Sequence, residues 1–203
     1  MVLRVINRHQ STNVRQKQII SAARRLIVKY GSEHVTVRRM AKEIGVSEAA
    51  IYRHFKSKRD ILSFLVDDIE DTLLTDIKGI YSDTLNPLET LEKIMRNHIS
   101  AVEQKKGVSF QVIAEIISFG DKKLNRKVHD VIDKYIERIR GILSEGVKAG
   151  IIRQDIDLNA TATLFFSMVQ GLVNIWALSN YHFNLDQRYT SVWEVFRHSI
   201  IKG

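Results

Sequence analysis

The sequence predicts an all-α fold, and three observations lead to this prediction. The 203 residues include one proline, Pro87, and only ten glycines, so few residues interrupt helices. Apolar residues recur three or four positions apart along most of the chain, as they do on one face of an α-helix. No alternating apolar and polar pattern is long enough to indicate a β-strand. Because 44% of the residues are hydrophobic and 27% charged, the chain can bury a core and is not expected to be disordered.

Four helices are expected in the first third of the chain, the first over residues 15–30. Two short helices follow, meeting at a turn near residue 45, and a fourth extends towards Ile80. The residues placed to begin the second, third and fourth helices are Thr36, Ser47 and Ser57, with Asp60 able to complete a capping-box-like pair. Gly31 and Gly45 are placed to end the first two helices.

Five further helices are expected, over about residues 86–104, 108–119, 128–149, 157–180 and 187–201. Asn86, Pro87 and Glu89 have the order of the N-cap, first and third positions of a helix. The expected organisation is therefore an N-terminal three-helix domain over residues 1–57 and a larger helical domain over residues 58–203.

The positive charge of the chain is confined to its first third. Residues 1–60 contain 14 lysines and arginines against 4 acidic residues, whereas residues 61–203 contain 17 against 19. A polyanion is the natural partner for the N-terminal part. A basic segment that only improves solubility is the alternative.

The two short helices have the layout of a helix-turn-helix. Gly45 permits a turn that a Cβ atom would hinder, and Val46 can fill the space between the helices. Met40, Ile51 and Phe55 can pack the pair against the first helix. This arrangement leaves Ala49, Tyr52 and Arg53 on the outer face of the third helix, which has the width of a DNA major groove.

Residues 36–62, TVRRMAKEIGVSEAAIYRHFKSKRDIL, resemble the DNA-binding domain of the TetR family of regulators, and residues 19–31 resemble that family's first helix. The resemblance covers about a quarter of the chain and implies a DNA contact surface made of Thr36, Val37, Ser47, Glu48, Ala49, Tyr52, Arg53, His54 and Lys58. Thr36, Tyr52 and Lys58 match positions that contact phosphates. At Ala50 the family commonly has Thr or Ser, so base recognition depends more on Arg53, which can pair bidentately with guanine.

Some of these positions have a simpler interpretation. Tyr52 can be a packing residue, and solvent-exposed charge is the alternative for Arg38, Arg39, Lys42 and Lys56.

No Asp, Glu, Lys or Arg occurs between Asp157 and Asp186. A membrane span is not expected there, because the segment has too many polar side chains for hydrocarbon. A helix packed on both sides is expected instead, and the resemblance implies a homodimer through the last two helices. The predicted interface residues are Phe166, Val169, Val173, Trp176, Val192 and Phe196. The resemblance also implies a small-molecule effector pocket, with predicted walls of His98, Phe110, Ile113, Ile117, Phe119, Tyr135, Phe165 and Gln170, although each can be an ordinary core residue.

The predicted function is a cytoplasmic transcriptional repressor that binds a palindromic double-stranded operator and is released by a hydrophobic effector. The alternative is an effector-independent DNA-binding protein of the same fold, architectural or linked to cell division, with a protein partner. The chain has no cysteine, no phosphate-binding glycine loop and no HExxH or GxSxG motif, so no enzyme activity, cofactor or metal site is expected. The N-terminal residues carry no apolar run typical of a signal peptide.

Overall fold

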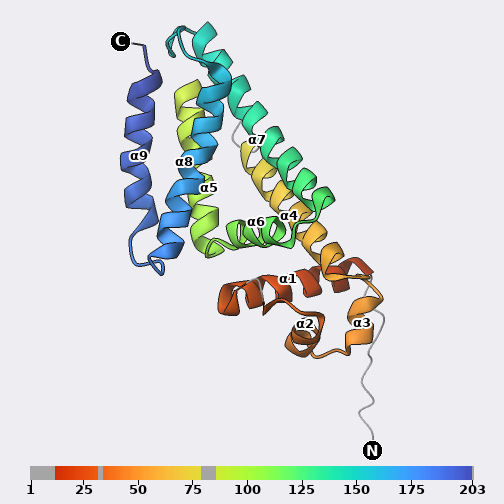
Figure 1. The fold of residues 1–203 in the computed structure, drawn as a ribbon. Coiled ribbons are helices and arrows are strands. Elements are labelled where there is room, and N and C mark those ends of the chain that lie inside the picture. The colour runs from red at the N-terminus through yellow and green to blue at the C-terminus, as the bar shows by residue number, and fades with distance from the viewer. Residues whose placement is uncertain (1–11, 32–33, 79–85, 203) are drawn as a thin grey trace, which may run out of the picture. The chain divides into compact units, whose positions relative to one another are not determined.

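The computed structural model describes residues 12–31, 34–78 and 86–202, and within them it confirms the all-α class (Figure 1). The described helices are α1 (Thr12–Tyr30), α2 (Val37–Ile44), α3 (Glu48–Tyr52), α4 (Lys58–Lys78), α5 (Pro87–Gln104), α6 (Val108–Phe119), α7 (Lys122–Lys148), α8 (Leu158–Leu178) and α9 (Leu185–Ile200). These residues form no β-strand, only an isolated antiparallel bridge between Ile152 and Ile201. The chain divides into two compact units, Met1–Leu65 and Val66–Gly203, which are described separately below.

The N-terminal unit is built on the apolar face of α1. Ile19, Ala23 and Ile27 of that face are buried, as the three-to-four spacing predicts. This unit ends at Leu65 rather than at residue 57, because the first turns of α4 belong to it and bury Ile61 and Leu65. The predicted end of α4 near Ile80 lies outside the described residues.

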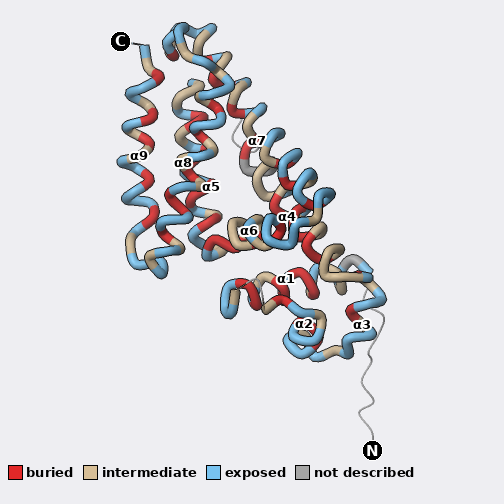
Figure 2. Tube along the Cα trace, viewed as in Figure 1, coloured by how far each residue is buried: buried red, intermediate tan, exposed pale blue. Residues whose placement is uncertain are grey.

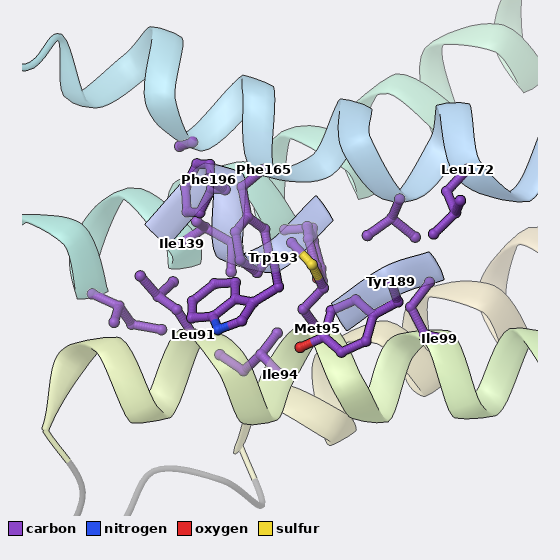
Figure 3. Close-up of a cluster of buried hydrophobic side chains, with 14 of the residues drawn as sticks. Leu91, Ile94, Met95, Ile99, Ile139, Phe165, Leu172, Tyr189, Trp193 and Phe196 are labelled. Carbon is purple, nitrogen blue, oxygen red and sulfur yellow. The ribbon is translucent and has the colours of Figure 1, made fainter. Parts of the chain in front are cut away.

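The C-terminal unit contains the larger core. Helix α8 packs against both α7 and α9, and α5 packs against α7 and α9. In Figure 2, buried residues recur along α5, α8 and α9 with exposed residues between them. Figure 3 shows Tyr189 and Trp193 of α9 directed towards Leu91 and Met95 of α5. All four side chains are buried, so α9 completes this core.

Local sequence signals set most helix ends. The predicted capping box at α5 is confirmed, because the Asn86 side chain accepts from the Glu89 N–H and the Glu89 carboxylate accepts from the Asn86 N–H. Helix α9 begins earlier than predicted, because the Asn184 side chain caps it by accepting from the Gln187 N–H. Its other end is fixed by backbone hydrogen bonds from the Arg153 N–H to Ile200 and from the Lys202 N–H to Ile151.

Candidate nucleic-acid interface and cavity

The turn between α2 and α3 has the geometry that the sequence predicts. Gly45 adopts a left-handed conformation with φ +68°, and its N–H and that of Val46 donate to the last carbonyls of α2. An added Cβ at Gly45 would meet no atom within 4 Å, so the backbone conformation, not crowding, favours glycine here.

Three hydroxyl side chains cap the helices around this turn. Thr36 accepts from the Arg39 N–H at 3.2 Å, and Ser47 accepts from the Ala50 N–H at 3.2 Å. Ser57 accepts from the Asp60 N–H at 3.2 Å, while the Asp60 carboxylate accepts from the Lys56 N–H instead of the Ser57 N–H. Each cap uses the hydroxyl oxygen as an acceptor, so the O–H of the exposed Thr36 and Ser47 can still donate to an anion.

Behind the turn, buried side chains fix the two helices. Met40 and Ile51 have no exposed surface, and Phe55 is also buried. The Phe55 ring meets that of Phe64 edge to face, with centroids 5.7 Å apart. This packing confirms the predicted inner face and gives the outer face a rigid support.

The outer face presents Ala49, Tyr52 and Arg53, all of which are exposed. Tyr52 is 50% exposed, which disfavours its alternative role as a packing residue. Arg53, predicted on the recognition helix or its cap, is the C-cap of α3. The side chain of His54 is half-buried, and its Nδ1 atom has no hydrogen-bond partner among the described residues.

The other residues predicted to contact DNA lie around the same turn. Val37 begins α2, Glu48 begins α3 and is exposed, and Lys58 begins α4, where it is half-buried and already makes a polar contact. The four cations with an alternative interpretation, Arg38, Arg39, Lys42 and Lys56, are all exposed.

The C-terminal unit contains a small apolar cavity of about 30 Å³. Helix α4 lines it with Val66, Ile69 and Leu73, and α7 lines it with Val128, Val131 and Ile132. The remaining walls are His98 of α5, Ser109, Phe110 and Ile113 of α6, and Phe166 and Gln170 of α8. A cavity of this size has room for about one water molecule.

The polar part of the cavity wall is uncharged at neutral pH. His98 is buried, and its Nδ1 lies 3.2 Å from the Tyr135 hydroxyl. Burial lowers the pKa of the His98 imidazole to about 4, so the ring is neutral at pH 7. The Tyr135 ring in turn meets Phe166 edge to face, with centroids 5.8 Å apart.

Four of the eight predicted pocket residues line this cavity: His98, Phe110, Ile113 and Gln170. Tyr135 does not line the cavity, but its hydroxyl contacts the His98 imidazole. The other three predicted residues do not line this cavity. Ile117 and Phe119 lie at the exposed end of α6, and Phe165 is buried against Phe196 in the core between α8 and α9.

Comparison with known proteins identifies the family. The family model "Bacterial regulatory proteins, tetR family" matches residues 19–63, and the model "YsiA-like protein, C-terminal region" matches residues 66–199. The chain belongs to the TetR family. It is therefore a DNA-binding transcriptional regulator, and its helix-turn-helix is the region described above.

Two kinds of relative resemble nearly the whole chain. The nucleoid occlusion factor SlmA of Idiomarina loihiensis is 26% identical over 189 residues, which cover 93% of this chain and 96% of the relative. The fatty acid metabolism regulator protein of Bacillus subtilis is 25% identical over 178 residues, which cover 88% and 91%. The crystal structure of FadR from Bacillus subtilis in complex with stearoyl-CoA superimposes with a TM-score of 0.74 at 25% identity, covering 89% of this chain and 96% of that chain. These relatives are regulators and nucleoid occlusion factors rather than enzymes.

The predicted dimer residues of this TetR-family chain need correction. Val169, Val173, Trp176 and Phe196 are buried inside the single chain, so they form its core and are not available to a second copy. Phe166 and Val192 are half-buried, and Phe166 lines the cavity. The outward apolar residues of α8 and α9 are instead Leu164, Ile175, Leu178 and Val195.

The sequence did not separate these faces because α8 carries no charged residue, and apolar side chains such as Leu164 and Ile175 also lie on its exposed side. By length and composition α8 could also cross a membrane, with a mean hydropathy of 1.4 over its most apolar window. One face of the same helix is buried in the core of the C-terminal unit through Ala162, Phe165 and Val169. A core helix of a water-soluble protein can meet the same hydropathy criterion.

Proposed function

We propose that this TetR-family protein is a repressor that binds a palindromic operator as a homodimer and leaves it when an apolar effector enters the cavity of the C-terminal unit. The observation that carries the proposal is the lining of that cavity. Helix α4 begins in the N-terminal unit, and its later turns supply Val66, Ile69 and Leu73 to the cavity wall. An effector that enlarges the cavity by displacing these turns of α4 would act on the helix that begins in the N-terminal unit.

The chemistry of the wall favours an effector with a long apolar part. Nine of the twelve lining residues are apolar, and the polar ones, His98, Ser109 and Gln170, carry no charge at neutral pH. The cavity of about 30 Å³ has to expand to accept such a molecule, so binding and movement of the wall are coupled. Since FadR from Bacillus subtilis was solved with stearoyl-CoA, long-chain acyl-CoA is the first effector class to test.

The proposed DNA contacts divide into two kinds. Thr36, Ser47, Tyr52 and Lys58 bind phosphates and fix the orientation of the module, whereas Arg53 reads a base. Replacing Tyr52 by Ala should weaken binding to all sequences. Replacing Arg53 by Ala should relax the preference at one base pair of each half-site. If DNA sites selected by the Arg53→Ala variant retain the full base preference, Arg53 does not read a base.

A test of release requires a known operator. Selecting the fragments of the source genome that the protein binds would identify one. Fluorescence anisotropy then measures operator affinity with stearoyl-CoA, with coenzyme A alone, and without either. We expect stearoyl-CoA to weaken operator binding about tenfold, within the usual range of coupling between two sites, and coenzyme A to have no effect.

Two matched variants locate the effector site. Ile113→Phe fills the cavity and should require a higher stearoyl-CoA concentration for release, without changing operator affinity in its absence. Ile117→Phe places the same ring on the same helix where the side chain is 67% exposed, and should behave like the parent protein. If neither stearoyl-CoA nor a small-molecule extract of cells changes operator affinity, the release proposal is wrong.

A second function deserves testing because SlmA relatives match the chain over 93% of its length. In that case the protein binds DNA independently of an effector and acts through a protein partner. Binding at many dispersed genomic sites, unchanged by stearoyl-CoA or metabolite extract, would favour this function. A few sites that respond to an effector would favour the repressor. Both functions place the protein with the chromosome in the cytoplasm.

A further inference from the structure

An exposed aromatic residue at the end of α1 carries the inference. Tyr30 is the last residue of that helix, and 46% of its surface is exposed. The guanidinium carbon of Arg39 lies 5.6 Å from the centre of its ring, and the Lys29 ammonium lies 5.0 Å from it. The His34 imidazole stacks on the same ring at 6.2 Å, with 13° between the two planes. Tyr30 therefore organises a basic cluster instead of filling a core.

The ring holds Arg39 without neutralising it. A cation over an aromatic face is attracted by the quadrupole of the ring, which has no net charge. Among the described residues, no carboxylate forms an ion pair with Arg39. The same two helices show the contrasting arrangement at Arg25, whose Nε lies 2.9 Å from the Glu43 carboxylate. A carboxylate fixes an arginine but cancels its charge, whereas Tyr30 fixes Arg39 and leaves the charge available for an anion.

Arg39 also stands at the edge of the proposed DNA interface. It lies in the first turn of α2, and its N–H donates to the hydroxyl oxygen of Thr36. The other cations of this helix, Arg38 and Lys42, are exposed as well. The polyanion available to a TetR-family helix-turn-helix is DNA, whose backbone presents phosphates along both sides of the groove.

We propose that Arg39 contacts a DNA phosphate and that Tyr30 is a positioning residue that holds the Arg39 guanidinium for this contact. The proposal rests on the DNA interface proposed above and extends it from α2 and α3 to the end of α1. It assigns a function to a residue outside the helix-turn-helix.

The test measures affinity for a fluorescein-labelled DNA duplex of random sequence, since phosphate contacts do not depend on sequence. Potassium chloride is varied from about 0.05 to 0.3 M. Log affinity falls as log salt rises, and each phosphate contact makes this slope steeper by about 0.9. Arg39→Gln should lower that slope by about 0.9 per bound chain and weaken binding about fivefold at 0.15 M salt. Arg138→Gln removes the same charge from an exposed position on α7 and should change neither quantity.

Variants of Tyr30 separate positioning from a general structural role. Tyr30→Phe keeps the ring and should bind within about twofold of the parent protein, whereas Tyr30→Leu should bind about two- to fivefold more weakly, the range expected for an exposed cation–π contact. When Arg39 is already Gln, Tyr30→Leu should cost less than about twofold, because the guanidinium that it positions is gone.

Two results would overturn the inference. One is an unchanged salt slope for Arg39→Gln, and the other is an equal cost of Tyr30→Leu with and without Arg39. Tyr52→Ala distinguishes this failure from that of the interface itself. If Tyr52→Ala weakens binding and Arg39→Gln does not, only the Arg39 contact is wrong. If neither variant weakens binding, the proposed DNA interface is wrong as well.

Discussion

Stability at acid pH should depend on one buried histidine. In the unfolded chain the pKa of the His98 imidazole is about 6.5, whereas burial lowers it to about 4 in the folded protein. Between these values the unfolded state binds a proton that the folded state excludes, so stability rises with pH across this window. The contribution is fully retained above about pH 6.5 and is lost progressively as the pH falls towards 4.

The size of the effect follows from the two pKa values. One pKa unit corresponds to about 1.36 kcal/mol, so protonation of His98 should lower the free energy of unfolding by about 3 kcal/mol between pH 6.5 and pH 4. The measurement is urea unfolding followed by circular dichroism at several pH values across this range. The result should be a steeper loss of stability with acid than in a variant that cannot titrate at this position.

His98→Gln is that variant, because the Gln amide does not titrate and can still hydrogen-bond with the Tyr135 hydroxyl. Its stability should change less between pH 6.5 and pH 4 than that of the parent protein, by up to about 3 kcal/mol. His182→Gln removes an exposed imidazole and serves as the control. Parallel pH profiles of the parent protein and His98→Gln would refute the assignment of acid sensitivity to this buried ring.

Two other predictions concern the surface and the packing of the C-terminal unit. Leu178→Glu alters a side chain that is 85% exposed in the single chain, so it should convert a dimer to folded monomers in light scattering, while Ile117→Glu on α6 should keep the dimeric mass. A dimeric Leu178→Glu protein would contradict the α8–α9 face as the interface. Gly146→Ala would bring a Cβ to 2.5 Å from the Ile152 side chain, and we expect it to lower stability by about 1–2 kcal/mol in thermal unfolding. Gly141→Ala on the same helix meets no atom within 4 Å and should raise stability by about 0.5–1 kcal/mol, so equal effects of the two substitutions would contradict the packing argument.

The sequence predicted the helix-turn-helix well because its signals are local. Thr36 and Ser47 cap the helices that follow them, and Gly45 adopts the left-handed conformation that ends α2. Each signal acts over three or four residues, so the pattern itself indicates the structure. Arg53 lies at the C-terminal end of the recognition helix, because α3 ends at Tyr52.

The assignments in the C-terminal unit depended on contacts between distant segments, which periodicity does not determine. In α8, Leu164 and Phe165 are neighbours of similar hydrophobicity, yet the first is exposed and the second is buried against Phe196. The contribution of α4 to the cavity was also missed. Its apolar residues were recognised, but their spacing does not say which helices they face.

The small size of the cavity would raise the effector concentration at which the protein responds under the proposed release mechanism. If only a fraction of the molecules have an open cavity, only that fraction can bind the effector. The apparent dissociation constant then equals the intrinsic one divided by this fraction. If that fraction were about 1%, the apparent dissociation constant would be about a hundredfold higher than the intrinsic one. Under the proposed release mechanism, a cavity with room for one water would set a concentration threshold: trace amounts of effector would leave the operator occupied, and substitutions that loosen the cavity wall would shift that threshold without altering a DNA contact.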